Sequence, residues 1–523
     1  MTYVNILTYV NFLYNLRDVL MQNNNTSNTN IWILNPDYKF KNDYDRIAMY
    51  STKQVQQYSS SDWISYIHPV QAFILNSFTD IMSLPDHYQC ISNTFNISYK
   101  DAERMISPYI ENETPIYTVW KGQKIVFPKN VLIKANKISD LSEIKKKEIP
   151  NLDTTKIDLT PDRMHKGPQT LLFMLTNKCV TNCKYCYADR KTKYTSLTTT
   201  EIFKIIDESK ALNLSYIDVI GGELFCKKDW YLILKKLVDE NLTPNYISTK
   251  VPLDEEKVRQ LYETGYNNVV QISLDALDDA VLNKIIGTPT GYIDKIKYSI
   301  QLLIEYGFKI QIDTILTRYN TQTKYIVNLF NYIKTIQNLV YWEIRIPEMS
   351  IYNPNGFHEI KCDRHILEDL RKYVSEKIMP QADFQIIFSD DAILDKYKKG
   401  KPEEESFMGG TCGILKSNLF VLPDGKVSVC EQLYWHPQFI VGDLRKQSLS
   451  EVWNSDKAKT LFYLKRELYK EKSICNKCQA FDLCNKKHHK CFVKIIKAYG
   501  QDNWNYPDPR CVYAPKVQSD LKY

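Results

Sequence analysis

The sequence lacks a long uninterrupted apolar run. Its first twenty residues are fairly apolar, but polar residues such as Asn5, Asn11 and Arg17 interrupt them, and neither a basic leading segment nor a small-residue cleavage site is present. We therefore expect no secretory signal peptide. No other stretch approaches the roughly 20 apolar residues that a membrane-spanning helix needs. The sequence thus predicts a cytoplasmic protein without a membrane partner.

A strong charge of one sign is also missing. The 523 residues carry 68 basic and 61 acidic side chains, which gives a formal net charge of +7. So small an excess, spread along the chain, does not favour binding to nucleic acid or to a membrane surface. The 44% hydrophobic and 25% charged residues are typical of a soluble globular protein. The length predicts about three domains.

Cysteine, in contrast, is plentiful. A long chain with 13 cysteines and no secretion signal favours clustered thiols that bind metal over a disulfide framework. Cys90, Cys226 and Cys362 stand alone in the sequence, and we expect them to be small buried hydrophobic residues. The other cysteines fall into tight groups, which are the candidate metal ligands.

The N-terminal part predicts a small α+β domain at residues 31–135, preceded by an extension and polar linker at 1–30. Its elements are arranged in the order expected of a winged helix-turn-helix. Residues 136–168, which are charged and punctuated by proline, are expected to form a linker. The expected elements are a strand pair at 31–34 and 45–50, helices at 68–82 and 98–106, and a hairpin at 116–127 that turns at Gly122.

Residues 169–350 alternate strand-like apolar runs with helical stretches. This alternation predicts a parallel sheet covered by helices. Six such units indicate an incomplete (β/α) barrel whose chemistry lies on the loops after the strands. Residues 351–408 are assigned to a bridging region, and the cysteine-rich residues 409–523 to a separate metal-stabilised module. The six runs are residues 171–175, 214–220, 243–249, 267–274, 308–316 and 340–346.

The loop after the first of these strands carries the motif CxxxCxxC, formed by Cys179, Cys183 and Cys186. A zinc site needs a fourth ligand, and no further cysteine or histidine lies nearby in the sequence. An iron–sulfur cluster held by three thiolates, with one iron left open, is favoured, and zinc is the weaker alternative.

These three cysteines, with the aromatic Tyr185 just before the third, resemble the signature of the radical SAM superfamily. The resemblance implies that the open iron binds the amino and carboxylate groups of S-adenosylmethionine. It also implies an oxidoreductase-type reaction, in which reductive cleavage of that cofactor yields a 5′-deoxyadenosyl radical that abstracts a substrate hydrogen. Tyr185 is then a candidate cofactor-binding residue.

Gly221, Gly222 and Glu223 follow the second expected strand and resemble the superfamily's GGE motif. In that family the motif holds the amino group of the methionine moiety. Without this context the three residues predict only a turn with a solvated acid.

Ser248, Ser273 and Asp275 end the third and fourth expected strands. They resemble family segments that contact the ribose and the carboxylate of the cofactor, although serine and aspartate also cap helices. Where relatives often place an arginine for the carboxylate, this chain offers only Lys284. The partner of the carboxylate is therefore left open.

The C-terminal cysteines resemble a SPASM domain, which carries auxiliary iron–sulfur clusters. Gly425 precedes one cysteine within the first characteristic segment, and the pattern CxxCxxxxxC forms the second. Binding of zinc by part of this set is the minor alternative, and His488 and His489 are expected in an exposed loop. The cysteines are Cys412, Cys430, Cys475, Cys478, Cys484, Cys491 and Cys511.

The resemblance implies three 4Fe–4S clusters besides S-adenosylmethionine. It assigns Cys475, Cys478, Cys484 and Cys511 to one auxiliary cluster. The remaining three cysteines hold the other, whose fourth iron corner lacks a nearby thiolate. Because a thiolate is a strong ligand for such iron, a substrate cysteine is the favoured occupant. Water, or a distant thiol such as Cys362, is the alternative.

The N-terminal region resembles the PqqD-like recognition element of peptide maturases, in which a precursor's leader adds as a strand to a sheet edge. Its helices lack an Arg/Lys stripe, which disfavours nucleic acid. We therefore expect a maturase that forms a thioether or C–C cross-link in a ribosomally synthesised peptide. The expected partners are the precursor, bound through its leader, and an electron donor such as flavodoxin or ferredoxin. The alternatives are sulfatase-maturase-like oxidation, peptide epimerisation, and an iron–sulfur DNA-binding regulator.

Overall fold

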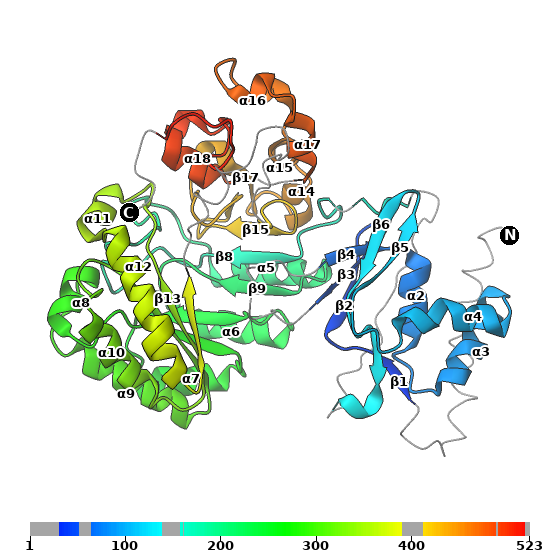
Figure 1. Ribbon diagram of the computed structural model, residues 1–523, viewed down its shortest axis with the longest axis horizontal. Helices are drawn as coiled ribbons and strands as arrows, with labels where there is room; N and C mark the ends of the chain where they lie inside the picture. Colours follow the sequence, from blue (N-terminus) through cyan, green and yellow to red (C-terminus); the bar gives the residue numbers. More distant parts are fainter. Residues whose placement is uncertain are drawn as a thin grey trace. The chain divides into compact units, whose positions relative to one another are not determined.

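The chain forms two compact units, residues 1–166 and 167–523, which we describe separately. The computed structural model describes residues 31–51, 64–138, 157–160, 162–389, 412–487 and 490–517 (Figure 1). The expected N-terminal extension lies outside the described residues. So do most of the expected linker, residues 390–408 of the bridging region, residues 409–411 of the cysteine-rich module, and both His488 and His489.

The N-terminal unit contains three small antiparallel sheets. Strand β3 (Ile47–Ser51) lies between β2 (Tyr38–Asn42) and β4 (Ile64–Ile67). The hairpin of β5 (Ile116–Trp120) and β6 (Gln123–Phe127) turns as predicted through Gly122, whose φ of 79° suits glycine. Strand β1 (Trp32–Leu34) pairs with β7 (Leu132–Lys134).

The predicted pairing of residues 31–34 with 45–50 is wrong. The pattern identified both strands but not their partners: β1 joins β7 from the far end of the unit, whereas β3 pairs with its neighbours β2 and β4. The partner of β1 lies far along the chain, so the local pattern around 31–34 does not identify it.

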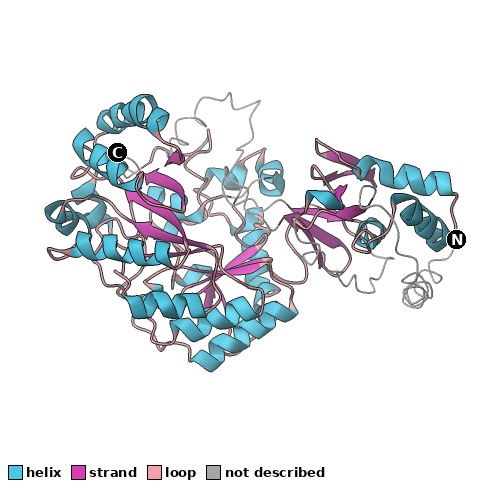
Figure 2. Ribbon diagram, turned by 90° about the horizontal axis from the view of Figure 1, so that it is seen from below, coloured by secondary structure: helices cyan, strands magenta, loops and turns pink. Residues whose placement is uncertain are grey.

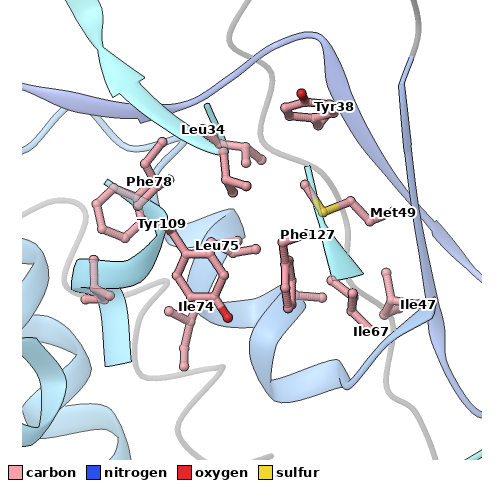
Figure 3. Close-up of a cluster of buried hydrophobic side chains, with 14 of the residues drawn as sticks. Leu34, Tyr38, Ile47, Met49, Ile67, Ile74, Leu75, Phe78, Tyr109 and Phe127 are labelled. Carbon is pink, nitrogen blue, oxygen red and sulfur yellow. The ribbon is translucent and has the colours of Figure 1, made fainter. Parts of the chain in front are cut away.

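Three helices and a buried apolar cluster complete the described part of this unit. The predicted helices are α2 (Pro69–Ser77) and α4 (Tyr99–Ile106), and α3 (Leu84–Phe95) lies between them. Figure 3 shows the cluster, in which Leu75 and Phe78 lie among strand residues such as Met49 and Phe127. The winged helix-turn-helix assignment stays a prediction.

The end of the expected linker packs against this same unit. The buried Arg46 guanidinium donates to the carboxylate of Asp43 (2.9 Å) and to the carbonyl of Arg163 (2.6 Å). Asp43 accepts in turn from the backbone amide of Lys166 (2.8 Å), and Leu159 joins the buried cluster. Residues 157–166 are thus part of the first compact unit.

The second unit is an α/β structure built on parallel strands, as predicted. Each of the six expected runs forms a strand, and helices lie along the outside (Figure 2). Strands β8 and β9 belong to one hydrogen-bonded sheet, and β10 to β13 to a second. The strands are β8 (Thr170–Phe173), β9 (Tyr216–Val219), β10 (Tyr246–Thr249), β11 (Val269–Ser273), β12 (Lys309–Ile315) and β13 (Leu339–Arg345). The helices between them are α5 (Thr199–Ala211), α6 (Trp230–Asp239), α7 (Glu255–Glu263), α8 (Asp279–Ile286), α9 (Tyr292–Glu305) and α10 (Thr323–Ile333).

Both sheets are extended by later parts of the chain. Strand β14 (Gln385–Ser389) of the bridging region runs parallel to β13. Strand β15 (Asn418–Val421), in the cysteine-rich part, runs parallel to β8 and continues into β16 (Lys426–Ser428) and β17 (Ile440–Asp443). The cysteine-rich part therefore shares a sheet with the first barrel strand. The remaining helices are α11 (Pro354–Ile360), α12 (Arg364–Tyr373), α14 (Leu449–Trp453), α15 (Asp456–Phe462), α16 (Ile474–Lys477), α17 (Phe481–Lys487) and α18 (Phe492–Tyr499).

The barrel strands alternate apolar and polar side chains. In β12, Ile310 and Ile312 are fully buried, and they alternate with Gln311 and Asp313. Because successive side chains of a strand point to opposite faces, the apolar set packs under the helices and the polar set lines the interior. The barrel interior is consequently polar. Among the residues that the structure describes, no helix is long and apolar enough to cross a membrane.

Candidate active site

The CxxxCxxC loop begins at the carboxyl end of β8, and its thiols lie close together. The hydroxyl of Thr181 lies 3.4 Å from the sulfur of Cys179 and 3.2 Å from that of Cys183. The amide of Cys186 donates to the carbonyl of Cys183 (3.1 Å). The three predicted thiols thus lie on one tightly turned loop.

The end of helix α8 fixes this loop from outside. The amides of Asn182 and Lys184 donate to the carbonyls of Ile286 (2.8 Å) and Ile285 (3.0 Å). These carbonyls belong to the last turn of the helix, where no amide of the helix itself donates to them. The helix end therefore holds the loop through backbone bonds that do not depend on side-chain identity.

The predicted glycine turn packs directly against the chain that enters the cysteine loop. Gly221 and Gly222 have φ angles of 71° and 51°. A Cβ atom on Gly222 would lie 2.0 Å from the carbonyl oxygen of Thr176, so a larger residue cannot fit. The amide of Glu223 donates to the carbonyl of Lys178 (2.8 Å). The turn and the cysteine loop are therefore one structural assembly.

Glu223 carries a buried carboxylate at the end of this turn. Its side chain accepts from the backbone amide of Lys250 (3.0 Å), and the residue is 3% exposed. Burial raises the pKa of Glu223 to about 7. A carboxylate held in this way is suited to an ammonium group, which would stabilise its ionised form.

Asp275 and Tyr185 come from different motifs and form one hydrogen-bonded pair. The Tyr185 hydroxyl donates to the Asp275 carboxylate (2.6 Å), whose other oxygen accepts from the amide of Ile315 (2.8 Å). Burial raises the pKa of Asp275. This network orients the predicted aromatic residue beside the cysteine loop.

The two predicted serines lie on neighbouring strands. Ser248 of β10 is opposite Gln271 of β11, and the Gln271 amide donates to the hydroxyl of Ser273 (3.0 Å). Since Ser273 is two residues from Gln271 on the same strand, both side chains point into the barrel. The predicted polar residues therefore share the interior face.

Lys250 belongs to the segment 248–250, which ends the third expected strand and resembles a family segment that contacts the cofactor. Its amine lies 5.5 Å from the centre of the Tyr185 ring. Burial would lower the pKa of Lys250, but the neighbouring Cys183 and Asp275 raise it above its ordinary value. Lys284, the cation expected from the sequence, is exposed and lies over the ring of Tyr319. Lys250 is thus the cation among the predicted cofactor residues.

Besides Lys250, further charged residues line the barrel interior. Arg345 pairs with Asp313 (3.0 Å) and Glu343 (2.6 Å), and the Ser389 hydroxyl donates to Glu343 (2.6 Å). Burial raises the pKa of Asp313 to about 6. The sequence analysis missed these residues, although polar residues at every second position of an otherwise apolar strand were a readable signal.

Glu431, which follows Cys430, lies within electrostatic range of this interior. Burial raises the pKa of Glu431, and its main opposing charge is Arg345 of β13. Tyr187 and Tyr246 also lie within electrostatic range of Glu431. The segment after Cys430 therefore lies at the barrel interior.

The seven C-terminal cysteines fall into two groups in space. Cys484 lies within electrostatic range of Cys475, Cys478 and Cys511. A second group consists of Cys412, Cys430 and Cys491, each near another of the three. Burial raises the pKa of Cys412 and of Cys484 to about 11, so an adjacent metal cation is needed to hold these thiols as thiolates.

The three isolated cysteines behave differently from one another. Cys362 is 3% exposed, as predicted, and its sulfur lies 3.6 Å from the hydroxyl of Thr321, away from both C-terminal groups. Cys90 and Cys226 are only partly buried. Cys226 lies near Cys179, within electrostatic range. In the described ranges, no three Cys, His, Asp or Glu side chains surround a single-ion position.

The residues of the cysteine loop and the glycine turn fit an iron–sulfur cluster with S-adenosylmethionine. Three thiols supply the donors that iron prefers. The glycine turn leaves backbone exposed beside them, and the buried Glu223 carboxylate complements an ammonium group. The cationic amine of Lys250 is suited to the carboxylate of S-adenosylmethionine.

Comparison with known proteins agrees with this arrangement. Residues 173–331 match the radical SAM superfamily, and residues 412–479 match the SPASM iron–sulfur cluster-binding domain. The cysteine loop and the glycine turn both lie inside the first match. The chain is a radical SAM enzyme. It uses S-adenosylmethionine and iron–sulfur clusters.

Curated relatives of this radical SAM enzyme share part of its length. A PqqA peptide cyclase of Granulibacter bethesdensis is 22% identical over 291 residues, which cover 55% of this chain and 74% of that protein. A GTP 3′,8-cyclase of Clostridium perfringens is 28% identical over 163 residues, which cover 30% of this chain and 49% of that protein.

A solved structure matches the fold over most of the enzyme. SuiB of Streptococcus suis, bound to S-adenosylmethionine, superposes with a TM-score of 0.60 at 16% identity. The match covers 92% of this chain and 99% of SuiB. SuiB has also been solved bound to its precursor peptide SuiA.

Proposed function

We propose that this radical SAM enzyme matures a ribosomally synthesised precursor peptide by forming a cross-link within it. The observation that carries the proposal is the position of Glu431, which joins the C-terminal cysteines to the polar barrel interior beside Arg345. A substrate residue bound in that interior would lie near Glu431, the residue that follows Cys430. The names of the relatives, PqqA peptide cyclase and SuiB with its precursor peptide, agree with a peptide substrate.

The cysteine loop and the residues around it would hold the cofactors. Cys179, Cys183 and Cys186 would bind the first cluster, and the Glu223 carboxylate would accept from the methionine ammonium. Lys250 would pair with the methionine carboxylate. Ser248, Ser273 and the Tyr185–Asp275 pair would contact the rest of the cofactor. When bound, these cofactors supply a 5′-deoxyadenosyl radical, which removes a hydrogen atom from the peptide.

The barrel interior would bind the reacting part of the peptide. Asp313 and Glu343 both face Arg345, so the interior holds more carboxylates than cations. Such a surface binds amide N–H groups and cationic side chains of a peptide. Asp313, whose pKa burial raises to about 6, can hold or release a proton near neutral pH.

A thioether is the favoured cross-link because the second auxiliary group has only three thiols. Cys412, Cys430 and Cys491 would bind three iron corners of a four-iron cluster. Cys362, the remaining distant candidate, lies between α11 and α12, where its sulfur is 3.6 Å from the hydroxyl of Thr321. A cysteine of the peptide would therefore bind the fourth corner, where its sulfur is held for attack by the carbon radical. If water occupies that corner, the C–C cross-link is the favoured product.

The N-terminal unit would bind the leader of the precursor. In its described part, β2 and β4 are the edge strands of the three-stranded sheet. An extended leader can add to either edge through backbone hydrogen bonds. An external protein such as flavodoxin or ferredoxin would supply the electron.

Co-expression of the enzyme with the short open reading frame nearest its gene tests the function. Mass spectrometry of the peptide should show the loss of two hydrogens, and iodoacetamide should fail to label the cysteine that forms a thioether. An unchanged mass with an altered residue configuration would indicate epimerisation. A modified peptide in which every cysteine still reacts with iodoacetamide would contradict the thioether.

Hydrogen exchange on the full-length enzyme tests the leader site. Addition of the leader peptide should protect amides of β2 or β4 and leave the β5–β6 hairpin unchanged. Protection of α3 and α4 by duplex DNA, lost at higher salt, would instead favour a DNA-binding regulator.

A further inference from the structure

Lys490 lies between the two groups of C-terminal cysteines. Its amine donates to the hydroxyl of Tyr469 (2.7 Å) and to the sulfur of Cys475 (3.6 Å). The same side chain lines a cavity of about 30 Å³ together with Cys412 of the other group. One lysine thus contacts the four-cysteine group and borders the three-cysteine group.

Aromatic and apolar side chains surround this amine. It lies 4.4 Å from the centre of the Tyr469 ring and 5.4 Å from that of Phe481. Tyr469, Cys475 and Phe481 are buried together in one cluster, against which Leu464 and Leu468 pack. In such surroundings the effective dielectric constant is low, so a charge acts more strongly on its neighbours than it would in water.

The charge of Lys490 is not cancelled by a carboxylate. It donates hydrogen bonds to a phenol and a thiol, and in the described part of the chain no acidic side chain forms an ion pair with it. The nearby Lys497 differs, because its amine is paired with Glu348 (2.9 Å). A lysine amine is protonated at neutral pH. The positive charge at Lys490 therefore acts on the thiolates beside it.

We infer that the Lys490 ammonium raises the reduction potential of the cluster at Cys475, Cys478, Cys484 and Cys511. This inference rests on the ligands assigned under the proposed function. A reduced cluster carries one more negative charge than an oxidised one, so a neighbouring cation stabilises the reduced form. Hydrogen bonds to the cluster sulfurs act in the same direction. Lys490 is thus a positioning residue that favours the reduced state of this cluster.

A redox titration followed by electron paramagnetic resonance tests the inference. The full-length enzyme is used with Cys179, Cys183 and Cys186 replaced by alanine, so that only auxiliary clusters contribute. In Lys490→Gln, one midpoint potential should fall. At the wild-type midpoint, the ratio of reduced to oxidised cluster should drop about tenfold, which corresponds to about 59 mV for a one-electron couple.

Two further variants control for charge and position. Lys490→Arg keeps the charge and should keep the wild-type midpoint. Lys477→Gln removes an exposed lysine that lies between Cys475 and Cys478 in the sequence, and solvent screening should leave the midpoint unchanged.

Other outcomes separate the inference from the proposed function. An unchanged midpoint in Lys490→Gln, or an equal shift in Lys477→Gln, would overturn the inference and leave the ligand assignment intact. Loss of the cluster from Lys490→Gln but not from Lys490→Arg would show that the positive charge is needed to assemble the cluster. This result would also overturn the inference. Absence of auxiliary iron from the starting protein would instead refute the ligand assignment.

Discussion

The two cysteine sites of this enzyme are built in opposite ways. Cys179, Cys183 and Cys186 lie on one loop, held by backbone bonds to the end of α8. The C-terminal cysteines extend from Cys412 to Cys511 and are brought together only by the tertiary structure. A local motif is readable from the sequence alone, whereas a dispersed one becomes readable only by resemblance to a family.

Their surroundings differ as much as their construction. Beside the loop lie Glu223, Lys250 and Asp275, which are ionisable groups able to bind a charged cofactor. Beside the four-cysteine group lie Lys490 and the aromatic Tyr469, whose contacts fix a charge in place. The first site is therefore suited to binding and cleaving a small molecule, and the second to holding an electron.

Removal of the loop thiols should have the largest effect. Replacement of Cys179, Cys183 and Cys186 by alanine should abolish formation of 5′-deoxyadenosine, because no other set of residues would hold the first cluster. Iron analysis should still find the auxiliary iron. Cys362→Ala is the matched control, since this buried thiol belongs to neither site. Undiminished cofactor cleavage in the triple variant would disprove the assignment of the loop.

Removal of the three-cysteine group should separate cofactor cleavage from peptide modification. With Cys412, Cys430 and Cys491 replaced by alanine, 5′-deoxyadenosine should still form near the wild-type rate, while the modified peptide is lost. Chromatography of the nucleoside and mass spectrometry of the peptide measure the two outcomes. A modified peptide produced by this variant would show that the group has no part in the cross-link.

A single carboxylate should account for part of the affinity for the cofactor. Glu223→Gln removes a charge-assisted hydrogen bond worth about 1.5–3 kcal/mol, so the dissociation constant of S-adenosylmethionine should rise roughly 10- to 100-fold. Because the pKa of Glu223 is about 7 and only the ionised form accepts from an ammonium, wild-type affinity should increase with pH and level off above that value.

Calorimetric titration across that pH range measures both effects. The Glu223→Gln variant should show little of the pH dependence. A wild-type affinity that does not vary between pH 6 and 8 would mean that this carboxylate does not bind the cofactor.

The smallest expected effect concerns the contact between the C-terminal part and the barrel. Arg445 donates to the carboxylate of Glu201 (3.0 Å) and to the carbonyl of Ser196 (2.9 Å). Since both side chains are partly exposed, Arg445→Met should cost about 1 kcal/mol of unfolding free energy and lower Tm by about 1–3 °C. Calorimetry measures the shift. Arg259→Met, which breaks a more exposed pair, should leave Tm unchanged.

Much of the barrel could be predicted because its strands are apolar runs separated by helical stretches. All six runs became strands, and the GGE turn lies beside the cysteine loop where the resemblance put it. Partners of strands were not predictable in the same way. The pairing of β15 with β8 joins distant parts of the chain, and nothing in the local pattern of either strand specifies the other.

The missed residues have a common physical cause. Arg345 ends β13 and Glu343 lies two residues before it, and charged residues at such positions read as solvated caps until the barrel closes around them. Helix α3 was missed although its buried residues, His87, Tyr88, Ile91 and Ser92, recur at helical spacing. Its start at Ser83, which caps the helix, was a further available signal.

The parallel pairing of β15 with β8 bears on the order in which the enzyme assembles during synthesis. Ribosomes add residues at about 5–20 per second, and β8 emerges long before Leu419 can pair with Leu171. Until then, the strand that leads into the cysteine loop has β9 as its hydrogen-bonded neighbour on one side only. A nascent or prematurely terminated chain consequently lacks a finished support for its radical-generating loop. The sheet that leads into that loop is complete only when β15 is in place.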